Sequence, residues 1–92
     1  MTDQNTEQAA GLPEVTFSTF ILSIGSSALV QLGEVPDPET GQPMENLLAA
    51  KHSIDILSML QEKTKTCLEP DEKQLLDTLL YDLRMKYVVK TK

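Results

Sequence analysis

The segment that decides the fold is FSTFILSIGSSALVQLG, residues 17–33, which contains no charged side chain. Extended back to Val15, the uncharged run is 19 residues long, and Glu14 and Glu34 bound it. Large apolar residues recur within it at spacings of four, three, four and four, the period of one helix face. They are Phe17, Ile21, Ile24, Ala28 and Leu32. The segment predicts a helix over 16–32 whose opposite face is also free of charge.

Both ends of this helix carry local signals. Thr16 has a hydroxyl that can cap the free amides of the first turn. Val15 and Phe20 have the spacing of a hydrophobic staple across the helix start. Gly33 suits the left-handed residue that ends many helices, and Pro36 prevents the helix from resuming.

Two further helices are predicted, over 44–66 and 70–90. The first follows Pro43 and has an apolar stripe opposite charged residues, typical of an amphipathic helix; the stripe is Leu47, Ala50, Ile54 and Leu57. The second begins at Pro70, with acidic residues at its start and lysines toward its end, as the helix dipole favours. Its broad stripe is Leu75, Leu76, Leu79, Leu80, Leu83 and Tyr87. Because few residues join these two helices, they are expected to form an antiparallel hairpin.

No segment alternates with a period of two, so the predicted fold class is all-α, with three helices in one domain over 15–92. Residues 1–14 are polar, acidic and without period, and they are expected to form a disordered tail. The sequence GEVPDPETGQP, residues 33–43, is dense in Pro, Gly, Asp and Glu and reads as a turn-rich connector.

The charge distribution argues against nucleic acid as a partner. The chain has a formal net charge of −6, and no Lys or Arg precedes Lys51, whereas seven acidic residues do. Proteins bind nucleic acid mainly through Lys and Arg on phosphates, and this chain has no such basic patch. The lone Cys67 permits no internal disulfide and the first ten residues do not form a secretory signal, so the cytoplasm is the expected location.

Residues that could carry chemistry are few. His52, the single histidine, falls at the border of a polar helix face and is expected on the surface. Cys67 is expected to pack as a small hydrophobic residue beside Leu68. A zinc site needs more Cys or His than the chain has. The segment DPETG, residues 37–41, lacks the ligand spacing and closing glutamate of a calcium loop. We therefore expect no enzyme activity, no metal and no cofactor.

Three interpretations of the uncharged helix stay open. In the first, its small polar face meets water in a monomer. In the second, that face lets a helix of another copy approach closely, which favours a homodimer or small homo-oligomer. In the third, the segment lies in a membrane, since 19 residues reach about 28 Å, although six hydroxyls and acidic flanks argue against it. The candidate interface residues on this helix are Thr19, Ser23, Ser26, Ser27 and Val30.

The third helix supports association. Tyr81, Met85 and Val88 recur at i, i+4 and i+7 on the side opposite its main stripe. A helix with two apolar faces has more surface to bury than one hairpin partner covers. Association also enlarges a core that three short helices leave small. These three residues are therefore added to the candidate interface.

Three segments together resemble a known family: PEVTFSTFILSIGSSALVQLGEVPDPETGQP, then IDILSMLQEKTK, then LLYDLRMKYV. They are similar to a bacterial family catalogued as a domain of unknown function (number eighteen forty-four), and the resemblance covers about Pro13 to Val88. It implies a small, helical, cytoplasmic protein with no assigned activity and no catalytic residues to transfer.

The sequence thus leads to the hypothesis of a non-enzymatic module for protein–protein interaction that associates with itself. The alternative is a membrane-associated accessory protein that uses its uncharged first helix. Another protein is a further candidate partner, and the acidic connector over 33–45 would offer it a docking surface.

Overall fold

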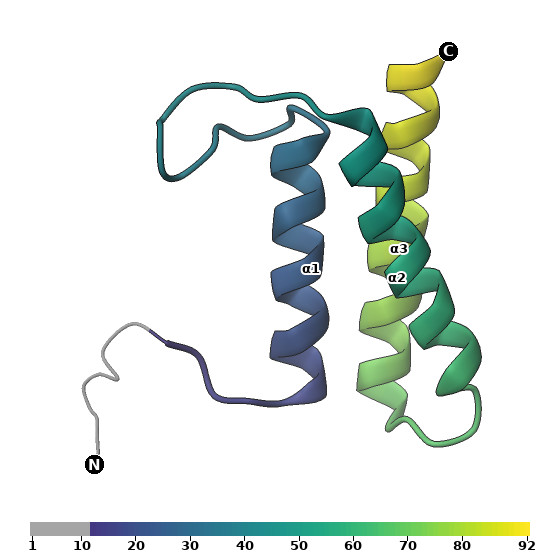
Figure 1. Cartoon of the computed structure of the whole chain (residues 1–92). Helices are drawn as coiled ribbons and strands as arrows, with labels where there is room; N and C mark the ends of the chain where they lie inside the picture. The colour runs from purple at the N-terminus through teal and green to yellow at the C-terminus, as the bar shows by residue number, and fades with distance from the viewer. Residues whose placement is uncertain (1–11) are drawn as a thin grey trace.

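The computed structural model describes residues 12–92, which form three helices that run up, down and up in Figure 1. They are α1 (Phe17–Gln31), α2 (Leu47–Lys63) and α3 (Pro70–Thr91). The predicted all-α class and the antiparallel α2–α3 hairpin are confirmed. Of the predicted tail over 1–14, residues 1–11 lie outside the described part, and residues 12–14 are irregular and exposed.

The start of α1 is closed by a pair of threonines. The amide of Thr19 donates to Oγ1 of Thr16 over 3.0 Å, and the amide of Thr16 donates to Oγ1 of Thr19 over 3.0 Å. This reciprocal capping box confirms Thr16 as the cap. The staple contact predicted with Phe20 is not formed, because Val15 is 97% exposed.

The end of α1 is set by Gly33, which adopts a φ of +77°. Its amide donates to the carbonyl of Val30, and the amide of Glu34 donates to the carbonyl of Leu29, both over 2.9 Å. This pair of bonds is the Schellman arrangement, which satisfies carbonyls that the helix end would leave free. The predicted left-handed residue is therefore confirmed.

The predicted second helix, over 44–66, began too early and ended too late, because α2 spans Leu47–Lys63 and residues 64–67 form a turn. Residues 44–46 are extended: Glu45 forms an isolated antiparallel bridge with Leu32, and the amide of Asn46 donates to the carbonyl of Gln31 over 2.7 Å. Asn46 then caps α2, because its Oδ1 accepts from the amide of Ala49 over 3.1 Å. The contact with the end of α1 therefore delays the helix to Leu47.

The core lies between the three helices, which all pack against one another, and each contributes to it. Within residues 12–92, nine apolar residues are buried: Ile21, Ala28, Leu32, Ala50, Ile54, Leu57, Leu76, Leu80 and Leu83. All nine belong to the predicted apolar stripes, so the helical periodicity identified the buried sides correctly. Burial of these side chains is the main term that stabilises the fold.

A close apolar contact and a hydrogen bond between helices complete the assembly. Gly25 is buried on α1, and a Cβ at this position would lie 2.9 Å from Cδ1 of Leu79, so the glycine lets α1 and α3 approach. The hydroxyl of Ser53, which is buried, donates to Oε1 of Gln31 over 2.8 Å and thus ties α2 to α1. Its polar group is therefore satisfied in the interior.

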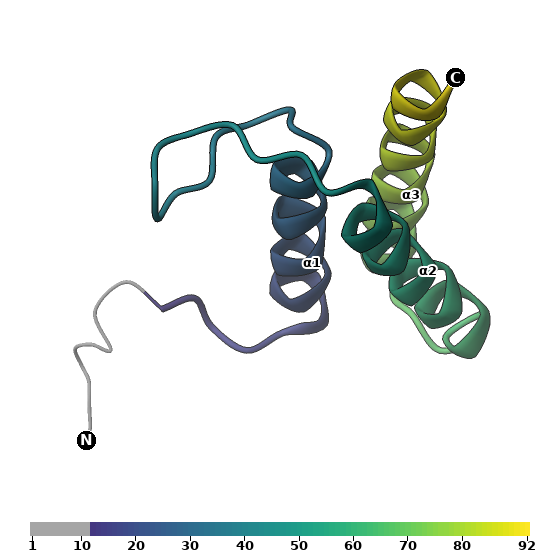
Figure 2. The ribbon, with the colours of Figure 1, turned by 45° about the horizontal axis from the view of Figure 1, so that its top comes forward.

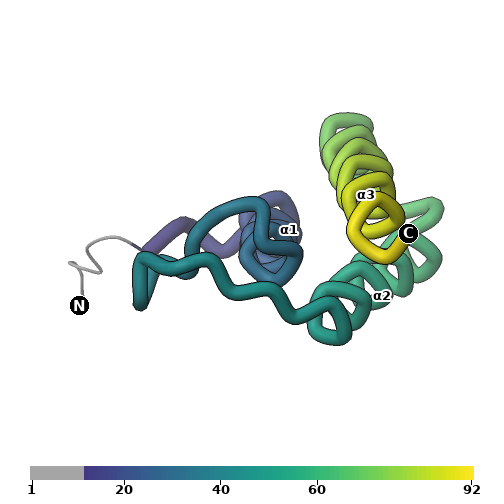
Figure 3. Tube along the Cα trace, turned by 90° about the horizontal axis from the view of Figure 1, so that it is seen from above, coloured from purple at the N-terminus to yellow at the C-terminus, as the bar shows by residue number. Residues whose placement is uncertain are grey.

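The molecule is thin. Its principal extents are 48 × 39 × 16 Å, and a single helix with side chains already measures about 10–12 Å across. Seen from above in Figure 3, α1 stands at one side, and α2 and α3 stand at the other. Each helix therefore keeps a side that no other part of the described chain covers.

Candidate interaction surfaces

The outward side of α1 faces away from α2 and α3. The connector and residues 12–16 both project from this side, one at each end of the helix (Figures 1 and 2). Ser23, Ser26 and Ser27 are exposed here, and Thr19 and Val30 are half-buried. Since α1 contains no charged residue, the structure presents the candidate residues as one uncharged face.

Two of these residues have local hydrogen bonds that the helix itself supplies. The hydroxyl of Ser23 donates to the carbonyl of Phe20 over 2.7 Å, the return bond that serine makes within helices. The hydroxyl of Thr19 belongs to the capping box and also donates to the carbonyl of Glu14. Thr19 therefore holds the start of the helix, a role that sequence reasoning missed because capping boxes usually carry Glu or Gln at this position.

A hollow lies at each end of this face. Toward the end of α1, the connector forms an open groove of about 270 Å³. Its lining is Ser26, Ser27, Val30, Gln31, Asp37, Pro38 and Met44. A second hollow of about 190 Å³ lies toward the start of α1, between residues 13–16 and Thr19, Phe20 and Ser23. The uncharged face is therefore bordered by projecting chain at both ends.

The outward side of α3 is more apolar. Tyr81, Met85 and Val88 are 69%, 52% and 57% exposed, whereas Leu80 and Leu83 on the opposite side are fully buried. Val89 is also exposed and extends this surface. It was not among the predicted residues, although its place next to Val88 in the sequence was a signal that could have identified it. Exposed apolar residues are common singly, but a row of neighbours is typical of interaction sites.

The two outward sides point in different directions. Gly25 on α1 faces Leu79 on α3, so the side of α1 opposite to Gly25 is turned away from α3 (Figure 3). A single two-fold contact between copies would therefore use one of these faces. A contact of one face with the other would be head-to-tail.

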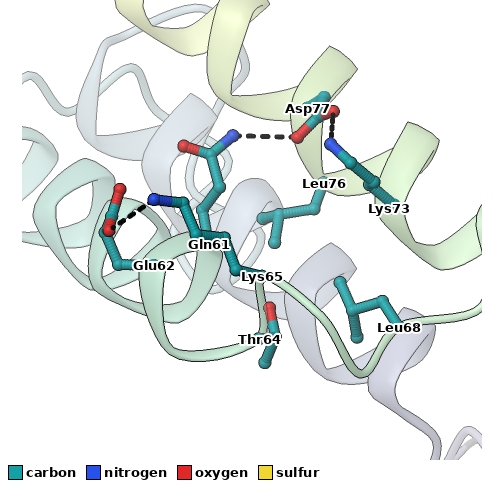
Figure 4. Close-up of a pocket in the computed structure, with 8 residues that line it drawn as sticks. All are labelled: Gln61, Glu62, Thr64, Lys65, Leu68, Lys73, Leu76 and Asp77. Carbon is teal, nitrogen blue, oxygen red and sulfur yellow. Dashed lines mark hydrogen bonds and ion pairs between the residues drawn. The ribbon is translucent and has the colours of Figure 1, made fainter.

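A third hollow lies at the α2–α3 turn, and its charged groups are already paired (Figure 4). Its volume is about 220 Å³. Nζ of Lys73 lies 2.7 Å from Oδ2 of Asp77, and Nε2 of Gln61 donates to Oδ1 of Asp77 over 2.8 Å. Lys73 and then Gln61 lower the pKa of Asp77 below its ordinary value of 3.8. The hydrogen bond from Gln61 to Asp77 joins α2 to α3, so we assign the hollow to hairpin stability.

The other residues considered for chemistry lie on the surface. His52 is exposed, as expected. Cys67 is also exposed, which corrects the expectation that it packs beside Leu68; only Leu68 packs against the core. Within residues 12–92, no three His, Cys, Asp or Glu side chains gather in a way that could hold a metal ion. In the same part of the chain, no helix combines the length and apolar character needed to cross a membrane.

The acidic connector is organised by its own turns. The amide of Glu39 donates to Oδ1 of Asp37 over 2.8 Å, and the amide of Gly41, with a φ of +71°, donates to the carbonyl of Asp37 over 2.7 Å. Glu45 pairs with Lys90 over 3.3 Å. The structure thus confirms turn chemistry for the segment DPETG.

These features define the class of protein: a small three-helix fold with two exposed helix sides, the serine-rich side of α1 and the apolar side of α3. The chain belongs to the family described as the domain of unknown function DUF1844, whose model matches residues 14–89 and thus covers nearly all of the three helices. The resemblance noted in the sequence is thereby confirmed. No curated protein and no solved structure matches the chain.

Proposed function

We propose that this protein is a non-enzymatic helical module that acts through protein–protein contact and associates with a second copy of itself. The observation that carries the proposal is that, among residues 12–92, nothing covers two outward helix sides, the serine-rich side of α1 and the apolar side of α3. A free exposed thiol at Cys67 is compatible with a reducing compartment, so the proposal includes the cytoplasm.

Energetics favour association. The described residues bury nine apolar side chains in a molecule 16 Å across its shortest dimension, and small cores of this kind supply little stability alone. Covering an exposed apolar side adds about 25 cal/mol for each Å² removed from water. An exposed row of large apolar residues is therefore a stabilising contact once a second copy covers it.

The test is sedimentation equilibrium of the full chain at rising concentration. We expect the weight-average mass to rise toward twice that of one chain. A protein that keeps the mass of a single chain up to about 500 μM, well above the micromolar range of weak specific contacts, refutes the proposal.

Charge variants locate the contact. Ser23→Glu/Ser27→Glu places two negative charges on the outward side of α1, and Thr40→Glu/Thr66→Glu adds the same charge at exposed turn positions. Weaker association of the serine variant alone assigns the contact to α1. If both variants associate as strongly as the wild type, the outward side of α1 is not part of the contact, and the apolar side of α3 remains as the candidate.

A further inference from the structure

Six exposed residues, five on the outward side of α3 and one just beyond its end, have the spacing of a coiled-coil seam. Their spacings are four, three, four, three and four, which is the heptad period of two paired helices. We call them the outer row: Gln74, Thr78, Tyr81, Met85, Val88 and Lys92. The row lies opposite the buried side of α3, so a straight helix can dock on it without displacing α1 or α2.

The outer row can pair with the same row of a second copy that runs in the opposite direction. If a second α3 runs antiparallel, with the two-fold axis on the outward side at the level of residue 83, Tyr81 of each copy faces Met85 of the other. Thr78, which has the shape of valine, then faces Val88. A shift by one heptad would place Val88 opposite Asp71 in one direction and Tyr81 opposite Lys92 in the other, so the centred arrangement pairs the most apolar residues with one another. Antiparallel seams pair the two alternating positions in this way.

Charge along α3 selects the antiparallel direction. Asp71 lies in the first turn of α3 and Lys92 lies just beyond its last turn, whereas Lys90 is already paired with Glu45 of its own chain. An antiparallel pair brings the basic end of one helix near the acidic start of the other and opposes their dipoles, whereas a parallel pair would gather the lysines of both copies.

The available area suits a dimer of modest affinity. Tyr81, Met85, Val88 and Val89 are each more than half exposed, and together they offer on the order of 500 Å² per copy. Both copies and the flanking polar residues reach roughly 1,200 Å², the lower end of specific interfaces. We therefore expect a dissociation constant in the micromolar range.

We propose that the partner of this surface is α3 of a second copy, docked antiparallel through the outer row about an axis at the level of residue 83. The inference rests on the proposed self-association and adds the surface and the geometry to it.

The first test compares two methionines by sedimentation equilibrium. Met85→Glu places a charge in the outer row, and Met59→Glu makes the same change on α2, where Met59 is 48% exposed compared with 52% for Met85. Because each dimer contains two copies of the change, we expect Met85→Glu to raise the dissociation constant roughly 100-fold or more. Met59→Glu and Ser23→Glu/Ser27→Glu should leave it within about threefold. Both methionine side chains are exposed, so circular dichroism should show unchanged helix content.

The second test measures direction, in a Cys67→Ser background. Tyr81→Cys and Met85→Cys chains should form a disulfide when mixed, because those positions face each other in the antiparallel pair and a disulfide needs close Cβ atoms. Efficient cross-linking of either variant alone would show a parallel pair and overturn the proposed geometry.

The outcomes separate the two proposals. A wild-type chain that stays monomeric refutes self-association as a whole. A wild-type dimer that Met85→Glu does not weaken, or that only the serine variant weakens, leaves self-association standing and overturns the assignment to α3.

Discussion

The contact between Gly25 and Leu79 predicts that Gly25→Ala destabilises the wild-type protein but stabilises a Leu79→Ala variant. A Cβ added at Gly25 would lie 2.9, 3.0 and 3.3 Å from Cδ1, Cδ2 and Cγ of Leu79. Carbon atoms pack best at about 3.5–4.0 Å, so the leucine must move by roughly 0.5–1 Å. Overpacking of this kind costs about 1–3 kcal/mol, whereas replacing glycine by alanine within a helix gains about 1 kcal/mol. We expect Gly25→Ala to destabilise the wild type by about 1 kcal/mol.

Removing the leucine should reverse this result. Leu79→Ala leaves room for the new Cβ, so only the helix-propensity gain remains. In that background we expect Gly25→Ala to stabilise the protein by about 0.5–1 kcal/mol, which gives a coupling energy of about 1.5–2 kcal/mol. Ser26→Ala, at the next and exposed position of α1, is the matched control. It should have the same small effect in both backgrounds.

Urea denaturation followed by far-ultraviolet circular dichroism measures all four members of this cycle. Protein concentration must be equal throughout, since association contributes to apparent stability. Equal m values would show that the free energies of unfolding can be compared. If Gly25→Ala has the same effect with and without Leu79, within about 0.5 kcal/mol, the close approach of α1 and α3 is not what requires glycine at this position.

Three further predictions concern the core, a carboxylate and a helix end. By urea denaturation, Leu80→Ala should cost about 2–5 kcal/mol, because Leu80 is fully buried, whereas Leu48→Ala, at a site 84% exposed, should stay within about 0.5 kcal/mol. Asp77→Asn should cost about 0.2–1 kcal/mol at neutral pH, where Asp77 is paired with Lys73. Because the folded state lowers the pKa of Asp77 below 3.8, this contribution is present above that pH and is lost as pH falls through the lower folded-state pKa, so thermal unfolding of the variant and wild type should converge well below pH 3.8. Gly33→Ala should cost about 1–2 kcal/mol, again measured in urea, because it forces alanine to a φ of +77°.

The fold was predictable where local pattern and burial agree. The stripe through Ile21, Ala28 and Leu32 identified the buried side of α1, and Thr16 and Gly33 identified its ends, because a cap and a left-handed residue act within one turn. The start of α2 was placed too early, after Pro43, although Asn46 is a preferred cap residue and does cap α2; a non-local contact keeps residue 45 out of the helix, since Glu45 bridges to Leu32 across the connector. No sequence signal near Pro43 reports that contact.

The sequence predicted which side of each helix is exposed, but it did not predict how the exposed sides of different helices are oriented relative to each other. Periodicity placed Ser23 and Met85 on the sides opposite the buried stripes, and both are exposed. It could not show that these sides point in different directions, since that depends on how α1 and α3 cross, and Gly25 controls the crossing through its contact with Leu79. The exposure of Cys67 was missed because Cys67 lies in a turn, and a turn has no sequence periodicity that indicates which side chains are buried.

The separation of the two outward sides has a consequence for the proposed dimer. A contact through the outer row of α3 leaves the outward side of α1, with its groove beside Val30 and Met44, uncovered in both copies. A two-fold dimer would therefore present two identical uncharged faces, and a partner with two matching sites would bind both with an effective concentration set by the dimer. The same two faces on separate monomers would lack this gain. Self-association through α3 would thus strengthen weak contacts made through α1. The uncharged side of α1 would then act as one of two linked binding sites, which a monomer does not have.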